Sequence, residues 1–262
     1  MLKINEIIQK KGKEKIIMLT AYEYLTAKYL EQAGVDIILV GDSSGMVFSG
    51  HKDTLPVTVD DMIYHTKAVM RGAKETPVIV DMPFMSYQVS VEEAKKNAGK
   101  ILKETGAAGV KMEGGVEICE QVRALLKTGI PVMGHTGMQP QMTRKYGGYP
   151  VIGKNELERK QLIENCKALE EAGVFAIVLE KVKAEVAKEI TEFLKIPTIG
   201  IGSGPFCDGQ VLVTHDLLGA FLDFKPKFVK QYEKIGWRSI KAIKKFIDEV
   251  KKKKFPGKNY YF

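Results

Sequence analysis

The sequence predicts a single (β/α)8 barrel with a short N-terminal helix and a basic C-terminal helix, and three observations lead to this fold class. The length of 262 residues is close to the roughly 250 that such a barrel needs. Short apolar runs alternate with amphipathic helical patterns, which favours parallel strands joined by right-handed crossovers. No linker, repeat or composition break divides the sequence, so we expect residues 1–262 to form one domain.

In the first half of the chain, short apolar strands end on polar residues and helices end at glycine. The expected helices are residues 4–11, 24–33, 60–72 and 91–105, and the expected strands are residues 16–20, 37–40, 77–81 and 108–113. Gly34 and Gly106 follow two of the helices, where glycine readily adopts the left-handed conformation that ends a helix. Four strand-helix units are therefore predicted here.

The second half repeats this alternation around one long loop. The expected helices are residues 116–127, 156–172, 183–193 and 229–250, and the expected strands are residues 131–134, 175–179, 196–200 and 211–214. The loop at 136–153 is rich in glycine and proline, which is typical of a lid or a binding loop. The last helix carries an apolar stripe, which predicts that it packs on the body of the protein.

Composition indicates a soluble globular protein. Apolar residues are 45% and charged residues 27% of the chain, and no apolar run reaches the roughly 20 residues of a membrane span. The first residues lack the apolar core of a signal peptide, so we expect a cytoplasmic protein without a membrane partner. The three cysteines are far apart, which predicts neither a disulfide framework nor a cysteine metal site.

The net charge of +8 is concentrated at the C-terminal end. Residues 225–262 contain 13 Lys or Arg against three acidic residues, so the rest of the chain is slightly acidic. An RNA-binding scaffold that uses this tail is the non-enzymatic alternative. Lys251 to Lys254 lack the interleaved aromatic residues of a base-stacking surface, so we expect no nucleic-acid partner.

Polar residues stand where five of the predicted strands end. They are Asp42, Asp81, Lys111 with Glu113, His135 and Glu180. The carboxyl ends of barrel strands meet above a packed core, so these side chains are expected to converge. Several buried carboxylates that face one another require a compensating cation.

Asp42 and Asp81 predict a site for a hard divalent ion. Mg²⁺ is bound by one or two carboxylates and completes its octahedral shell with water and substrate oxygens. The alternative is that both residues only cap the helices that follow them. We favour the metal site because two carboxylates suffice for Mg²⁺ and no HxxxH motif or cysteine pair indicates a softer metal.

The remaining polar residues suggest substrate binding and proton transfer. Lys111 and Glu113 are two apart and share one face of their strand, either as an ion pair or as a lysine for an anionic substrate beside a carboxylate that supports the metal. Glu180 follows an apolar strand that would raise its pKa and suit it to act as a general base, although an ion pair with a following lysine is possible. His135 donates to a substrate oxygen or holds the next loop, and Ser43 supplies donors to a carboxylate or forms a turn.

A glycine-rich loop, residues 200–204, follows the seventh predicted strand. This is the usual position of a phosphate-binding loop in an α/β barrel. The segment lacks the strand-helix context of a dinucleotide-binding fingerprint, so the sequence alone does not assign its ligand.

Several strings resemble ketopantoate hydroxymethyltransferase, a family within the phosphoenolpyruvate mutase and isocitrate lyase superfamily. The strings are Val40-Gly41-Asp42-Ser43, Asp81-Met82-Pro83-Phe84-Met85, Val110-Lys111-Met112-Glu113-Gly114-Gly115, Gly134-His135-Thr136-Gly137 and Ile199-Gly200-Ile201-Gly202-Ser203-Gly204. The similarity runs in order from about residue 3 to Gly257.

The resemblance implies the first step of pantothenate synthesis on a Mg²⁺-dependent (β/α)8 barrel. The reaction moves a hydroxymethyl group from 5,10-methylenetetrahydrofolate to 3-methyl-2-oxobutanoate, giving 2-dehydropantoate, in a homo-oligomer that is a decamer built as a pentamer of dimers. Carried over by motif, the metal residues are Asp42, Asp81 and Glu113, the keto-acid residues include Ser43 and Lys111, and Glu180 is the proton acceptor. A superfamily C–C lyase or mutase acting on a dicarboxylate or a phosphonate is the enzymatic alternative.

Overall fold

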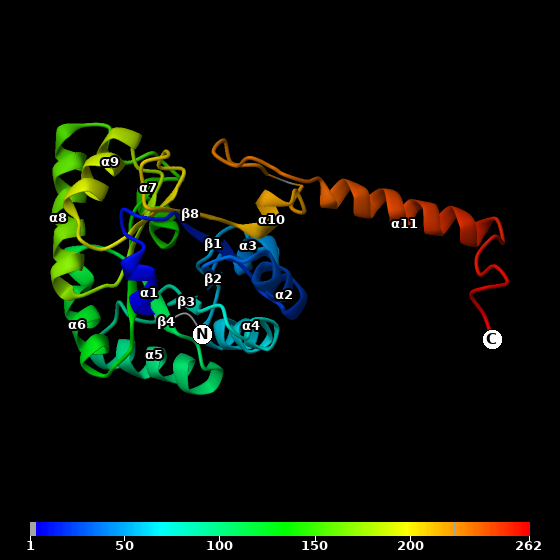
Figure 1. The fold of residues 1–262 in the computed structure, drawn as a ribbon, viewed down its shortest axis with the longest axis horizontal. Helices are drawn as coiled ribbons and strands as arrows, with labels where there is room; N and C mark the ends of the chain where they lie inside the picture. The colour runs from blue at the N-terminus through cyan, green and yellow to red at the C-terminus, as the bar shows by residue number, and fades with distance from the viewer. Residues whose placement is uncertain (1–3, 223) are drawn as a thin grey trace. The chain divides into compact units, whose positions relative to one another are not determined.

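The computed structural model describes residues 4–222 and 224–262 and contains a closed barrel of eight parallel strands (Figure 1). The strands pair in sequence order, and the last pairs with the first. They are β1 (Ile16–Thr20), β2 (Ile37–Val40), β3 (Val78–Asp81), β4 (Gly109–Glu113), β5 (Val132–Gly137), β6 (Ile177–Glu180), β7 (Thr198–Ile201) and β8 (Gly209–Leu212). The predicted fold class is confirmed.

Six helices connect the strands on the outside of the barrel. They are α2 (Tyr24–Ala33), α4 (Val59–Gly72), α5 (Val91–Thr105), α6 (Cys119–Lys127), α8 (Glu156–Ala172) and α9 (Ala184–Phe193). Each contacts the next in this order, and Figure 1 shows them wrapped around the strands. Residues 202–208, all of which the structure describes, form no helix, so β7 and β8 are joined by the glycine-rich loop alone.

Local sequence signals set the helix ends. Thr58 and Asp61 form a capping box at the start of α4, and Ser90 caps α5 by accepting from the backbone of Glu93. The predicted stops at Gly34 and Gly106 are confirmed, with φ angles of 80° and 75°. Shorter helices that the sequence did not predict are α3 (Ser44–Val47), α7 (Thr143–Tyr146) and α10 (Thr214–Leu217).

Successive side chains along each strand point alternately into the barrel and toward the helices, and so form two apolar cores. One face contributes residues such as Met18, Leu39 and Ile79 to a cluster inside the barrel, which the buried Ile7 of α1 (Ile4–Gln9) joins. The other face packs beneath the helices. The predicted N-terminal helix is therefore present and belongs to the barrel core.

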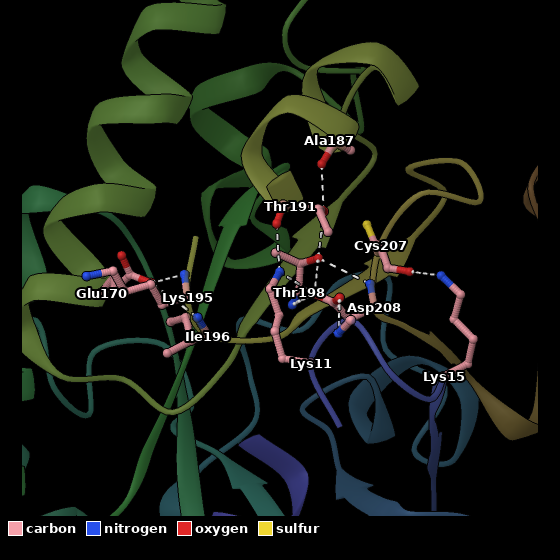
Figure 2. A network of polar contacts seen from close by, with 11 residues as sticks. Lys11, Lys15, Glu170, Ala187, Thr191, Lys195, Ile196, Thr198, Cys207 and Asp208 are labelled. Carbon is pink, nitrogen blue, oxygen red and sulfur yellow. Dashed lines mark hydrogen bonds and ion pairs between the residues drawn. The ribbon is translucent and has the colours of Figure 1, made fainter. Parts of the chain in front are cut away.

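At the amino ends of the strands, one buried carboxylate joins segments that lie far apart in sequence (Figure 2). Asp208 accepts from the Thr198 backbone at 2.9 Å and forms an ion pair with Lys11 at 2.7 Å. The Asp208 carbonyl also accepts from the backbone of Ile16. This network ties β1, β7 and the start of β8 together where a connecting helix is missing.

The structure separates into two compact units, one ending at Leu212 and one beginning at Val213. The expectation of a single domain over residues 1–262 therefore stays a prediction. In the second unit, α11 (Ile235–Lys251) confirms the predicted terminal helix except at its start, since residues 229–234 are not helical. None of the residues of α11, all of them described, is buried. The expected burial of its apolar stripe is thus not observed, and Trp237 is 62% exposed. Among residues 4–222 and 224–262, no helix is both long and apolar enough to cross a lipid bilayer.

Candidate active site

Strand alternation places the polar strand-end residues inside the barrel, above its apolar core. Asp81 is two residues beyond the inward-facing Ile79, and Glu180 is two residues beyond the inward-facing Val178. Register completes the arrangement, since Asp81 pairs with Lys111 and Glu113 pairs with His135. Four neighbouring strands therefore deliver these residues to one place, as the sequence predicted.

The two aspartates expected to hold a metal are neighbours. The Asp42 backbone N–H donates to Asp81 Oδ2 at 3.1 Å, and both side chains are buried. Gly41 permits this approach, because a Cβ atom there would lie 2.7 Å from Ser43 Oγ and 3.4 Å from Asp81 Oδ2. Ser43 is positioned beside them by a 2.8 Å hydrogen bond between its hydroxyl and Tyr22 Oη.

Lys111 is the cation at the centre of the site. Its ammonium lies 2.8 Å from Asp81 Oδ1 and 3.0 Å from His135 Nδ1. Burial opposes its charge, but Asp81, Glu113 and Asp42 outweigh burial and raise the pKa of Lys111 above its usual value. It therefore remains protonated at neutral pH and available to an anionic substrate.

His135 is held as a neutral donor. Burial and the charge of Lys111 lower its pKa well below the usual value. Since the lysine can only donate, His135 Nδ1 accepts and its proton lies on Nε2. That nitrogen has no hydrogen-bond partner among the described residues and faces Glu180 Oε2 at 3.4 Å. Its N–H is thus free for a substrate oxygen or for Glu180.

Glu180 has the electrostatics of a general base. Burial raises its pKa to about 7, against the opposing charges of Lys111 and Lys181. The sequence anticipated this shift from the apolar strand that precedes Glu180. The alternative ion pair with a following lysine does not form, because the Lys181 side chain instead donates to the Tyr149 carbonyl.

Gln141 is a site residue that the sequence did not reveal. Its side-chain amide donates to Asp42 Oδ2 and to the Met82 carbonyl, both at 2.9 Å, and its backbone N–H donates to Glu113 Oε2 at 3.0 Å. Tyr87 Oη lies 3.0 Å from its side-chain oxygen. Gln141 thus binds the segment between β5 and α8 to two of the carboxylates, and no local pattern distinguishes it from other glutamines. The loop predicted at 136–153 is wrong at its start, because β5 runs to Gly137, and the segment contains α7.

The acidic residues fit a two-carboxylate Mg²⁺ site better than a cage of side chains. No group of three or more His, Cys, Asp and Glu side chains surrounds a common metal position in residues 4–222 and 224–262. Burial, followed by the charge of Asp81, raises the pKa of Asp42 to about 7, and burial followed by Asp42 raises that of Glu113 well above its usual value. Lys111 compensates the charge of only one of these three carboxylates, through its ion pair with Asp81. The remaining negative charge favours a further cation, and Mg²⁺ needs only one or two carboxylates.

Comparison with known proteins shows a clear family relationship. The sequence model of the family described as ketopantoate hydroxymethyltransferase matches residues 1–258. Two similar proteins are both named 3-methyl-2-oxobutanoate hydroxymethyltransferase. The Clostridium kluyveri protein is 56% identical over 97% of this chain and 90% of its own length, and the Caldicellulosiruptor bescii protein is 53% identical over 98% and 97%.

Solved structures with low sequence identity share the fold. A phosphonopyruvate hydrolase in complex with oxalate and Mg²⁺ aligns with a TM-score of 0.65 at 12% identity, over 99% of this chain and 93% of that one. A 2,3-dimethylmalate lyase of the phosphoenolpyruvate mutase and isocitrate lyase superfamily aligns with a TM-score of 0.61 at 14% identity, over 98% and 90%. At these identities the likeness concerns the barrel alone.

Proposed function

The chain belongs to the ketopantoate hydroxymethyltransferase family and is an enzyme, and from this premise we propose that it converts 3-methyl-2-oxobutanoate to 2-dehydropantoate with 5,10-methylenetetrahydrofolate as the one-carbon donor. One water molecule completes the hydroxymethyl group, and tetrahydrofolate is released. The observation that supports this most directly is the grouping of Asp42 with Asp81, next to Lys111 and within reach of a base whose pKa is about 7.

Asp42 and Asp81 would hold Mg²⁺, with Glu113 as the nearby third acid. When bound there, the metal supplies Lewis-acid polarisation of the substrate's 2-oxo group and so makes the C3 proton more acidic. The hydrogen bonds that Gln141 donates to Asp42 and Glu113 would hold these two carboxylates in position for the metal.

The chain's own groups then bind the keto acid and move its proton. The ammonium of Lys111 pairs with the substrate carboxylate, and the Ser43 hydroxyl, just beyond the end of β2, supplies a hydrogen bond. Glu180 takes the C3 proton, and the resulting carbanion attacks the methylene carbon of the folate. The Nε2–H of His135 steadies Glu180 or a substrate oxygen during this transfer.

The test is formation of 2-dehydropantoate by the purified protein from the two substrates. We expect product in the presence of Mg²⁺, loss of product after EDTA treatment and recovery when Mg²⁺ is restored. Absence of product under all three conditions would refute the proposal. The cytoplasmic location expected from the composition and the decameric assembly implied by the resemblance stay predictions.

A further inference from the structure

A hollow lies just beyond the carboxyl ends of β6 and β7. It is a cavity of about 600 Å³ lined by parts of residues 151–154, 182–184 and 202–204. Glu180 is the last residue of β6 and pairs with Ile201, the last residue of β7. The cavity therefore begins within two residues of the proposed base, but it shares no lining residue with the carboxylate cluster.

Backbone and side-chain hydrogen bonds hold the three lining segments together. Ile152 donates to the Lys181 carbonyl at 2.8 Å, and its own carbonyl accepts from the Lys183 backbone at 3.0 Å. The buried Ser203 hydroxyl donates to the Leu179 carbonyl at 2.7 Å and accepts from the Val182 backbone at 3.0 Å. The glycine-rich loop is thus fixed onto β6, and the cavity is a preformed feature of the barrel.

A glycine keeps the loop close to α9. A Cβ atom at Gly204, where φ is 81°, would lie 2.7 Å from Ala184 Cβ. A side chain at this position would therefore move the loop away from the helix and change the shape of the cavity.

The charge of the cavity is positive. Lys154 and Lys183 belong to its lining, and no acidic side chain does so among the described residues. Within the part of the chain that the structure describes, neither lysine side chain has an ion-pair partner. Lys181 differs, because its ammonium is engaged by the Tyr149 carbonyl and ring. Two free cations in a preformed hollow favour a ligand with more than one carboxylate.

Resting on the proposed function, we propose that this cavity binds the p-aminobenzoylglutamate end of the folate, with Lys154 and Lys183 pairing with the carboxylates of its glutamate tail. The methylene carbon must lie next to the substrate C3 and Glu180, so the rest of the folate has to extend away from the carboxylate cluster. The cavity offers this path, with the exposed Val151 available to the aromatic ring and the lysines available to the acidic end.

The test compares folates that differ only in the number of tail glutamates. Dissociation constants of tetrahydropteroate, which lacks the glutamate tail, and of monoglutamyl tetrahydrofolate, whose glutamate carries two carboxylates, are measured by calorimetry on the full chain, with Mg²⁺ and 3-methyl-2-oxobutanoate present. We expect the unaltered enzyme to bind the monoglutamate about tenfold more tightly than tetrahydropteroate, as two exposed ion pairs would give, and the Lys154→Gln, Lys183→Gln double variant to lose this preference. Lys95→Gln removes an exposed lysine of α5 and should keep it. Raising the salt concentration should shrink the preference only where the cavity lysines are present.

The outcomes separate this assignment from the proposed function. An enzyme that forms 2-dehydropantoate but binds both folates equally overturns the cavity assignment alone, and so does a double variant that retains the preference. An enzyme that forms no product from any folate overturns the function and this inference with it. Since both lysines are exposed, melting temperatures of the variants should equal that of the unaltered enzyme, which confirms that a lost preference does not reflect unfolding.

Discussion

Glu180 combines burial with a position at the centre of the proposed chemistry. Its pKa of about 7 means that roughly half of the enzyme carries the ionised base at neutral pH. We expect Glu180→Gln to bind the keto acid within about twofold of the unaltered enzyme, yet to lose deuterium exchange at C3 by about a hundredfold or more. Exchange in the unaltered enzyme should rise with pH and level off above about 7. Undiminished exchange in the variant, followed by proton NMR, would dismiss Glu180 as the base.

The same burial means that Glu180, once ionised at high pH, lowers the free energy of unfolding. Its pKa is raised from 4.5 to about 7 in the folded protein, so between these values the folded state binds more protons than the unfolded state, and stability falls as pH rises. Glu180→Gln removes this cost. We expect the metal-free variant to be more stable than the metal-free parent by about 2–3 kcal/mol at pH 8, and nearly equal to it below pH 4.5. Urea unfolding at the two pH values measures the difference, and equal stability at pH 8 would contradict a buried, ionised Glu180.

Gln141 tests how far the carboxylates depend on their supporting hydrogen bonds. Gln141→Leu keeps the approximate size but removes the donor to Asp42 and Met82. We expect Mg²⁺ affinity to fall about ten- to a hundredfold, as titration in the presence of the keto acid would measure. Gln161→Leu is the matched control, since that exposed glutamine donates to Glu164 and Asn165 of its own helix α8 and to none of the site residues. Equal Mg²⁺ affinity in both variants would show that Gln141 supports the loop alone.

Among single residues, the sequence predicted those site residues whose place in the site depends only on their position along a strand. Asp81, Lys111 and Glu180 converge because strand alternation and parallel register direct their side chains into the same end of the barrel. Gln141 and Tyr87 could not be predicted, since they reach the site through loop conformation and long-range contacts. Their partners lie tens of residues away, and nothing in their local sequence marks them.

Among the helices, two glycines test whether local propensity or packing decides stability. Gly72 ends α4, and a Cβ atom there would lie 2.3 Å from the Tyr24 carbonyl and 2.9 Å from Ala27 Cβ of α2. Gly99 lies inside α5, with nothing within 4 Å of such an atom. We expect Gly72→Ala to destabilise the protein by about 2 kcal/mol or more through overpacking. Gly99→Ala should stabilise it by about 0.5–1 kcal/mol through helix propensity. Chemical denaturation measures both, and equal effects would mean that α2 and α4 are not in close contact.

Secondary structure was predictable where apolar periodicity is strong. The strands ending at Asp81, Glu113 and Glu180 are confirmed. The prediction of the eighth strand at 211–214 is wrong by two residues, because β8 runs from Gly209 to Leu212. Gly209 and Gln210 have little strand propensity, and they are extended because they pair with Ile16 and Ile17 of β1. Short helices such as α3 and α7 were missed for a related reason, since four residues carry no detectable helical period.

In the barrel as a whole, the proposed active site and the contacts that join the last strands to the first lie at opposite ends of the strands. The carboxylate cluster lies at the carboxyl ends of the strands, whereas the Asp208 network lies at their amino ends, where β1, β7 and β8 begin (Figure 2). In α/β barrels the first end varies with activity and the second contributes stability. Residues at the two ends should therefore respond to substitution in different ways.

Asp208→Asn tests this separation. The variant keeps an oxygen for the Thr198 backbone but removes the charge that pairs with Lys11, whose ammonium also reaches the Thr191 carbonyl. Breaking a largely buried ion pair from one side leaves the other charge uncompensated, so we expect a loss of about 2–4 kcal/mol in unfolding free energy. At a temperature where the variant is fully folded, kcat and the KM for the keto acid should match the parent. Asp60→Asn, which breaks a pair on the surface, should change neither stability nor kinetics measurably, because solvent already screens that pair. If Asp208→Asn lowered kcat without lowering stability, the amino end of the barrel would have a part in the reaction, and the division between the two ends would be wrong.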